Sequence, residues 1–143
     1  MSEVVIDPQE YYVWLACENG WNRAVGFKAK IAGIDCSVVM VPFDPIEIVF
    51  SDLNSGSRIL SLPISILDMI MCDTKEKMLV LMKENAGLAA KKIEYSGIDL
   101  VREESRKAKG SFEKKFGPMP DFEKTSVYYD SVTEAIVKKT AAV

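Results

Sequence analysis

Apolar and polar positions alternate through much of the first half of the chain, as they do in strands that bury one face. In residues 25–31 apolar side chains alternate with glycine and lysine, whereas residues 36–41 are apolar almost throughout. Residues 46–53 and 58–62 are two further apolar runs, and the Asn-Ser-Gly-Ser sequence between them suits a hairpin turn because asparagine and glycine tolerate positive φ. The pattern therefore predicts a succession of four strands.

The residues before these strands carry signals for both a helix and a strand. Asp7 can cap a helix, Pro8 suits the first helical position, and Glu10 stands where a capping box needs its acid. The Tyr-Tyr-Val-Trp sequence at 11–14 consists of strong β formers and supports a strand instead. We give the capping signals more weight, and we expect a helix that ends at the Asn-Gly pair 19–20.

The period of the apolar residues changes after residue 73. Thr74 resembles a helix cap, and apolar side chains then recur every three or four residues to about residue 94, which predicts a long amphipathic helix with Ser-Gly beyond its end. Gly87 weakens this helix by about 1 kcal/mol relative to alanine. Residues 98–120 include a long charged run with little apolar stripe, so we expect a mobile or protruding charged arm there.

The last part of the chain predicts two short elements. Residues 125–129 suit a final strand, and the Ser-Val-Thr-Glu sequence at 131–134 is a capping box that opens a helix over about 132–139. Strands grouped before helices indicate an α+β fold, here a mainly antiparallel sheet of about four to five strands packed with an N-terminal helix, a long central helix and C-terminal helices. The chain has 143 residues, and we expect a single domain over 1–143.

Composition and charge indicate which cellular compartment and which classes of partner to expect. The formal net charge of −3 does not indicate a bulk basic surface for duplex nucleic acid. The three cysteines are scattered without Cys-x-x-Cys spacing, which indicates reduced thiols rather than a disulfide framework or a zinc site. No secretory signal, membrane-length apolar run or lipidation motif is visible, so we expect a cytoplasmic protein without a membrane partner.

The chain contains no histidine, and this absence excludes several kinds of chemistry. Serine–histidine and cysteine–histidine nucleophiles, histidine acid–base catalysis and histidine-containing zinc sites all need that side chain. The phosphate-binding loop, the dinucleotide-binding glycine fingerprint and the nucleophile elbow are also missing from the sequence. We therefore predict no catalytic residue, no metal ligand and no cofactor. An enzyme would have to use carboxylates, lysine, tyrosine or a thiolate.

Aromatic residues near the start of the chain are the candidate protein-binding residues. Tyr11, Trp14 and Trp21 lie within eleven residues of one another. Tryptophan and tyrosine are enriched at binding hot spots, which favours a contact with a partner. Core packing is the competing interpretation, since a chain of this length needs large buried side chains.

A stretch of cations interleaved with aromatic residues is the candidate anion-binding site. Such a pattern can follow a phosphate backbone and stack bases. The competing interpretation is a solvated helix, because the intervening glutamates offset part of the positive charge. The candidate residues are Arg102, Arg106, Lys109, Phe112, Lys114, Lys115 and Phe116.

Three functions remain open from the sequence. The first is a non-enzymatic interaction module that binds a protein partner as an adaptor, an inhibitor or a chaperone-like protein. The second is binding of a small anionic ligand such as a nucleotide, or of single-stranded nucleic acid, by residues 102–116. The third is a histidine-free carboxylate enzyme, which is favoured least because no motif fixes a site. A homo-oligomer is compatible with each function, since a polar helix that packs poorly on its own chain can pack on a neighbour.

Overall fold

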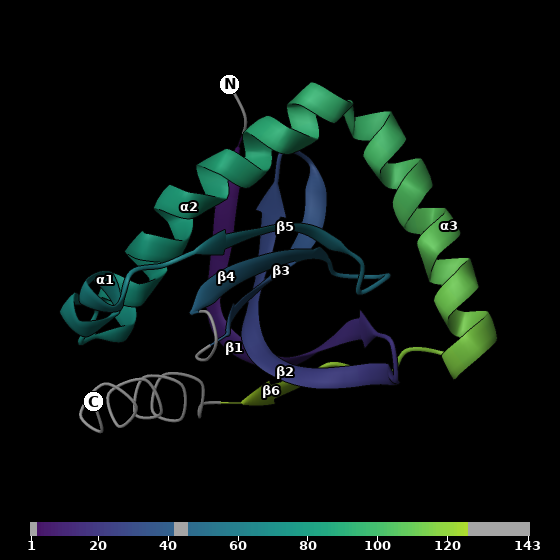
Figure 1. Ribbon diagram of the computed structural model, residues 1–143, viewed down its shortest axis with the longest axis horizontal. Coiled ribbons are helices and arrows are strands. Elements are labelled where there is room, and N and C mark those ends of the chain that lie inside the picture. Colours follow the sequence, from purple (N-terminus) through teal and green to yellow (C-terminus); the bar gives the residue numbers. More distant parts are fainter. Residues whose placement is uncertain (1–2, 42–45, 126–143) are drawn as a thin grey trace.

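Strands fill most of the first half of the chain and helices most of the second half (Figure 1). The computed structural model describes residues 3–41 and 46–125. In chain order the described elements are β1 (Val4–Cys17), β2 (Gly20–Ile31), β3 (Ile34–Val41), β4 (Glu47–Asp52), β5 (Arg58–Pro63), α1 (Ile66–Met71), α2 (Lys75–Ser96), α3 (Ile98–Phe116) and β6 (Glu123–Thr125).

The described strands form one sheet in which every neighbouring pair is antiparallel. Their order is β5-β4-β3-β2-β1-β6, so β1 to β5 form a meander and β6 pairs with the other edge of β1. Ala32 and Gly33 adopt positive φ values of 50° and 83°, which suit the tight turn between β2 and β3. The α+β class and the antiparallel sheet are confirmed, and the four predicted strands are β2 to β5.

The prediction of an N-terminal helix is wrong, because residues 4–17 form β1. The second half of β1 pairs residue for residue with β2 across a hairpin, and this cross-strand pairing outweighs the local capping signals. The pairing shifts between Ile6 and Glu10, where Asp7 Oδ1 accepts a hydrogen bond from the Gln9 amide at 2.9 Å. The residues that resemble a helix cap thus form a β-bulge, which is a place where a strand tolerates proline.

Helix α2 lies against one face of the sheet and closes the main hydrophobic core (Figure 1). Thr74 caps the helix, because its Oγ1 accepts a hydrogen bond from the Lys77 amide at 3.2 Å. The long helix predicted to reach about residue 94 is confirmed, and it ends at Ser96. Alternate side chains of the strands meet the inner face of α2 in this core, which includes Phe27, Val38, Phe50, Met78, Met82, Ala86 and Ile93.

The β1–β2 hairpin bends back toward the turn between β4 and β5. The Ala16 amide donates a hydrogen bond to the Gly56 carbonyl oxygen at 3.1 Å, which ties the two turns together. Strand β2 needs glycine at position 26, since a Cβ there would stand 2.5 Å from the Val38 carbonyl oxygen. Val39 lies on the face turned away from α2 and is nevertheless buried, so side chains are enclosed on both faces of the curved sheet.

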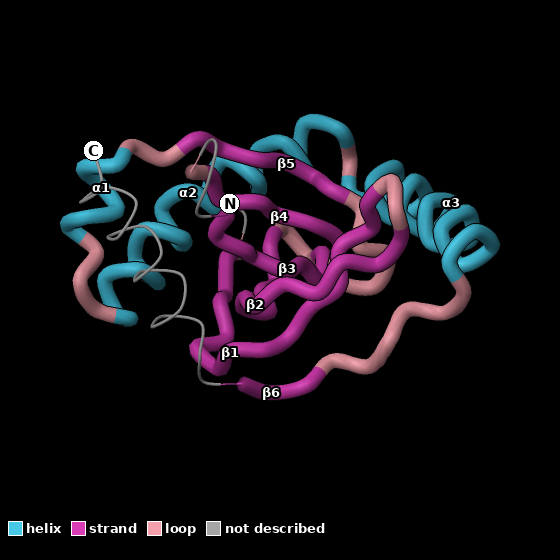
Figure 2. The backbone as a smooth tube through the Cα atoms, turned by 60° about the horizontal axis from the view of Figure 1, so that its bottom comes forward, coloured by secondary structure: helices cyan, strands magenta, loops and turns pink. Residues whose placement is uncertain are grey.

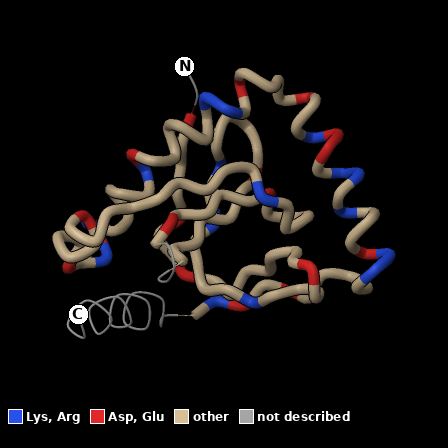
Figure 3. The backbone as a smooth tube through the Cα atoms, viewed as in Figure 1, with Lys and Arg blue, Asp and Glu red and all other residues tan. Residues whose placement is uncertain are grey.

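Helices α1 and α3 differ most from ordinary core helices. The sequence prediction contains no counterpart of α1, which Ser65 caps by accepting a hydrogen bond from the Asp68 amide. Helix α3 continues through Gly110 and has no buried residue, and charged residues follow one another along it (Figure 3). The charged segment predicted over 98–120 is therefore built from α3 and part of the connection to β6.

Most of the C-terminal predictions lie outside the described residues. Strand β6 overlaps the predicted strand 125–129 at Thr125, and the remainder of that strand and the predicted helix 132–139 lie beyond residue 125. None of the described helices is both long enough and apolar enough to cross a membrane.

Candidate functional site

One residue of the candidate protein-binding set contacts two residues of the candidate anion-binding set. The Trp21 ring packs edge to face against Phe112 and Phe116, with centroid distances of 6.1 and 5.8 Å. The two phenylalanine rings stack nearly parallel at 6.1 Å. Trp21 Nε1 also donates a hydrogen bond to the Gly117 carbonyl oxygen at 3.1 Å. This aromatic cluster attaches the C-terminal end of α3 to the β1–β2 hairpin.

The other two candidate protein-binding residues do not share a surface with each other. Tyr11 and Trp14 are three positions apart on β1, so their side chains point to opposite faces of the sheet. Trp14 Nε1 donates a hydrogen bond to the Asp121 carbonyl oxygen at 3.2 Å. The Tyr11 ring lies 4.1 Å from the ammonium of Lys28, a cation–π contact within the sheet. Each aromatic side chain therefore has a partner inside the chain.

The first two candidate anion-binding residues also contact their own chain. Arg102 donates a hydrogen bond to the Gly33 carbonyl oxygen at 3.2 Å and holds α3 to the β2–β3 turn. Arg106 pairs with Glu103 at 2.6 Å. The hydrogen bond from Arg106 lowers the pKa of Glu103, and the same bond raises the pKa of Arg106. Part of the positive charge of α3 is thus neutralised on the helix itself.

The remaining cations lie near the C-terminal end of α3. Lys109 Nζ stands 3.9 Å from the Glu113 carboxylate, which is a loose ion pair one turn away. Lys114 and Lys115 occupy the last turn, where positive charge interacts favourably with the helix dipole. The structure therefore separates the candidate anion-binding set into helix-stabilising cations and the aromatic pair that packs on Trp21.

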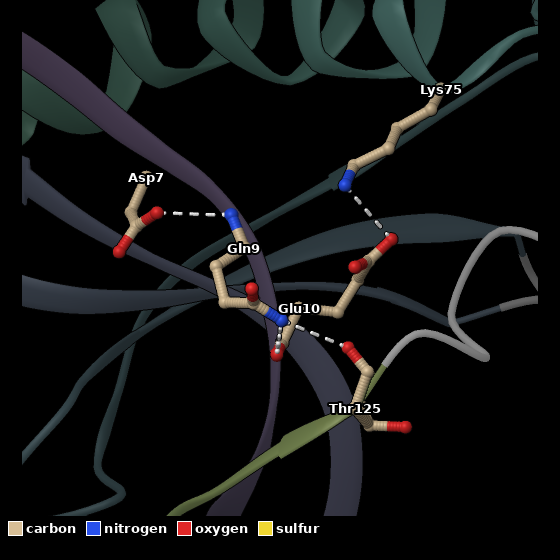
Figure 4. Close-up of polar contacts among 5 residues, drawn as sticks. All are labelled: Asp7, Gln9, Glu10, Lys75 and Thr125. Atoms are coloured by element: carbon tan, nitrogen blue, oxygen red, sulfur yellow. Dashed lines mark hydrogen bonds and ion pairs between the residues drawn. The ribbon is translucent and has the colours of Figure 1, made fainter.

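A buried carboxylate joins β1 to the start of α2 (Figure 4). The side chain of Glu10 is 7% exposed, and its Oε1 lies 3.1 Å from Lys75 Nζ. Next to it, Gln9 Nε2 donates a hydrogen bond to the Thr125 carbonyl oxygen at 3.1 Å and fixes the end of β6. No group of three potential metal ligands occurs among the described residues. The pair therefore links β1 to the first turn of α2.

A cleft lies where the start of β5, the end of α2 and the start of α3 meet. Its volume is about 210 Å³. Apolar side chains and three serines line it, and two cations and one carboxylate are also part of its wall. The lining residues are Ser57, Arg58, Ile59, Lys92, Ile93, Ser96, Leu100, Val101, Glu104 and Ser105. The cleft therefore combines an apolar surface with charged groups.

The strand beside this cleft is an edge of the sheet (Figure 2). Among the described strands β5 pairs with β4 alone, and its residues are half-buried or exposed. The pairing shifts at Ile59, which has no register partner on β4 because Leu60 and Arg58 face consecutive β4 residues. The ammonium of Lys92 donates a hydrogen bond to the Ile59 carbonyl oxygen. At least one backbone group of this edge, the Ile59 carbonyl oxygen, thus faces a side chain that lines the cleft.

Sequence reasoning missed this cleft because it forms where the start of β5 meets the α2–α3 junction, which lies more than thirty residues further along the chain. Leu100 is 53% exposed, and the sequence offers no signal that distinguishes it from a core leucine of α3. A hint was present at Pro63, whose missing amide hydrogen suits the end of an edge strand.

Helix α1 carries a second exposed apolar surface. Four of its residues have exposed fractions between 46% and 68%, and they are Ile66, Leu67, Ile70 and Met71. Large exposed apolar side chains that gather on one element are typical of contact surfaces.

Comparison with protein-family models, with curated proteins and with solved structures gave no match to this chain.

Proposed function

We propose that the protein is a non-enzymatic binding module that holds an extended segment of a partner protein along β5, with side chains of that segment in the cleft. The observation that carries this proposal is the position of the cleft beside an edge strand with a bulge at Ile59. An added strand gains affinity from backbone hydrogen bonds, and pockets for its alternate side chains give specificity.

The size and lining of the cleft support a side-chain pocket. Its volume of about 210 Å³ lies below the range of roughly 300–1,000 Å³ that is typical of sites for drug-sized ligands and cofactors. One or two side chains fill such a space. Leu100 exposes about half of its surface at this place, and covering an apolar side chain of this kind stabilises a complex by roughly 1 kcal/mol or more.

A selection from a displayed library of short random peptides on the full chain tests this function. The enriched peptides are then synthesised, and their dissociation constants are measured with the wild-type chain and with Leu100→Gln. We expect Leu100→Gln to weaken binding about tenfold, because an uncharged polar side chain replaces an apolar contact.

Leu88→Gln is the matched control, since Leu88 is 49% exposed on α2 and does not line the cleft. It should leave the dissociation constant unchanged. Equal binding by Leu100→Gln and the wild-type chain would exclude the cleft as the binding site, and a selection that enriches no binding peptide would argue against the function itself.

Binding of an anionic ligand by α3 is the second candidate. The observation in its favour is a shallow depression on α3 lined in part by Arg106, Lys107 and Lys114. Titration with single-stranded oligothymidine at increasing salt tests it, because phosphate contacts make affinity fall steeply with salt concentration. Affinity that stays flat with salt, or that survives Lys107→Gln combined with Lys114→Gln, would remove this candidate.

A further inference from the structure

Lys92 donates a hydrogen bond to the Ile59 carbonyl oxygen, the backbone acceptor that an added strand would need. This contact lies at the bulge where β5 and β4 lose their regular pairing. We propose that Lys92 makes the cleft selective for extended segments that carry an aspartate or glutamate. This inference rests on the proposed function, and it adds the chemical class of the segment.

The ammonium of Lys92 makes the hydrogen bond that a backbone amide of a bound segment would otherwise make to Ile59. A carbonyl that faces away from its own sheet at an edge has water, a side chain or another chain as its donor. When the amide of a bound segment takes the Ile59 carbonyl, the ammonium of Lys92 is released while it remains beside that segment. A carboxylate on the segment then replaces the carbonyl as its partner, and a charge-assisted hydrogen bond of this kind is stronger than the one it replaces.

The charges around the cleft favour the same class of ligand. Arg58 opens β5 beside Ile59 and adds a second positive charge to the lining, whereas Glu104 of α3 supplies the negative charge there. Two cations against one carboxylate leave an excess of positive charge. Complementary charges of this kind select among partners and accelerate their encounter.

A lysine whose ammonium lies at the edge of a sheet has another common role, which is to prevent the edges of two molecules from pairing. This role predicts a different outcome. A lysine that only blocks the edge makes no favourable contact with a bound segment, so its removal leaves the preference among peptides unchanged and promotes self-association of the chain. The experiment below separates the two roles.

The test uses the peptides enriched on the wild-type chain, each synthesised with its acidic residue intact and with glutamine or asparagine in its place. Dissociation constants are measured for the wild-type chain, Lys92→Met and Lys91→Met, where Lys91 is an exposed neighbour outside the cleft. We expect the wild-type chain and Lys91→Met to prefer the acidic peptide about tenfold. Lys92→Met should lose this preference and bind the neutral peptide at least as tightly as the wild-type chain does.

Two further measurements complete the test. Methylation of the peptide's backbone amides at alternate positions should abolish binding for one alternate set and not for the other, as strand addition requires. Circular dichroism and thermal unfolding establish that each variant is folded, and sedimentation shows whether Lys92→Met self-associates.

The possible failures are distinguishable. Enriched peptides that bind in the cleft but do not distinguish glutamate from glutamine would overturn the role of Lys92 and leave the proposed function intact. The same holds if Lys92→Met keeps the acidic preference, or if it gains only self-association. Peptides whose binding is insensitive to Leu100→Gln would overturn both the proposed site and this inference.

Discussion

Trp21 of β2 and Phe116 of α3 pack edge to face, with ring centroids 5.8 Å apart and ring planes at 76°. Helix α3 has no buried residue, so its far end depends on this contact and on the neighbouring one with Phe112. The other end of α3 follows α2 directly through Gly97 and is held by Arg102. The helix is thus fixed near its two ends and bordered by solvent between them.

Replacement of Trp21 by alanine should release the C-terminal half of α3 from the sheet. The change removes two ring contacts and the hydrogen bond to Gly117, and we expect the free energy of unfolding to fall by about 3 kcal/mol. Hydrogen exchange should accelerate in the last turns of α3 and stay slow in the centre of α2. Tyr95→Ala is the control, because Tyr95 is 95% exposed and its loss should matter little. Equal exchange rates in α3 for both variants would contradict the anchoring role of Trp21.

The sheet and the long helix could be predicted from the sequence because their signals are local. Alternation of apolar residues and an Asn-Ser-Gly-Ser turn identify β2 to β5, and the cap at Thr74 identifies the start of α2. The helix predicted in place of β1 is wrong because this segment is stabilised by pairing with β2, whereas the Asp7-Pro8 signal describes a bulge. Local capping signals and cross-strand pairing compete here, and the pairing determines the structure.

The candidate sites could be predicted only as lists of residues. Trp21 and Phe116 both belong to predicted candidate sites, but their contact spans 95 positions, from 21 to 116, and no local pattern reports it. The cleft depends on three elements that meet after the chain has folded, and its residues are individually ordinary. Lys92 has the sequence context of any exposed helical lysine, and its contact with Ile59 follows from the fold.

The ion pair between Glu10 and Lys75 should be more important for stability than the exposed pairs. Lys75→Met leaves the buried carboxylate of Glu10 without this cation, and we expect a loss of about 1–3 kcal/mol, below the value for a fully buried pair because Lys75 is 34% exposed. Urea denaturation measures the loss. Replacing both residues, as Glu10→Leu with Lys75→Met, should recover much of it, since no charge is then left buried.

Lys77→Met serves as the comparison for that experiment. Lys77 pairs with Asp73 at 2.6 Å near the same end of α2, but both side chains are more than half exposed. Solvent weakens such a pair, so the cost should be clearly smaller than that of Lys75→Met. Equal costs for the two variants, or a double variant as unstable as Lys75→Met alone, would show that burial does not set the strength of the Glu10 pair.

Alanine should lower the free energy of unfolding at one glycine, Gly26, and raise it at two others, Gly87 and Gly110. At Gly26 the new Cβ would stand 2.5 Å from the Val38 carbonyl oxygen, and the sheet must move, so we expect a loss of about 2 kcal/mol. At Gly87 and Gly110 nothing lies within 4 Å of the new Cβ, and each helix should gain up to about 1 kcal/mol. Thermal unfolding of the three variants gives the order. A destabilised Gly110→Ala would mean that α3 bends at this position.

The three cysteines should differ in their reactivity toward iodoacetamide. Cys36 and Cys72 are buried, and burial raises the pKa of both thiols, whereas Cys17 is partly exposed. Because the thiolate is the reacting form, Cys17 should be labelled first in the folded chain. Mass spectrometry of peptides after timed labelling measures each site. All three should react at similar rates in concentrated urea, and rapid labelling of Cys36 in the folded chain would contradict its burial.

The free energy of unfolding should fall at alkaline pH because of Cys36. Burial, with further contributions from Asp52 and Asp35, raises the pKa of this thiol from 9.0 to about 12. The unfolded chain loses the proton near pH 9 while the folded chain keeps it, so the stabilisation is complete below pH 9 and is lost between pH 9 and about pH 12. The difference amounts to roughly 1 kcal/mol at pH 10.

Urea denaturation at pH 8, 9 and 10 should therefore give a steeper decline for the wild-type chain than for Cys36→Ala, whose smaller side chain lowers stability equally at every pH. Parallel declines would mean that the Cys36 thiol ionises at the same pH in the folded and unfolded chains.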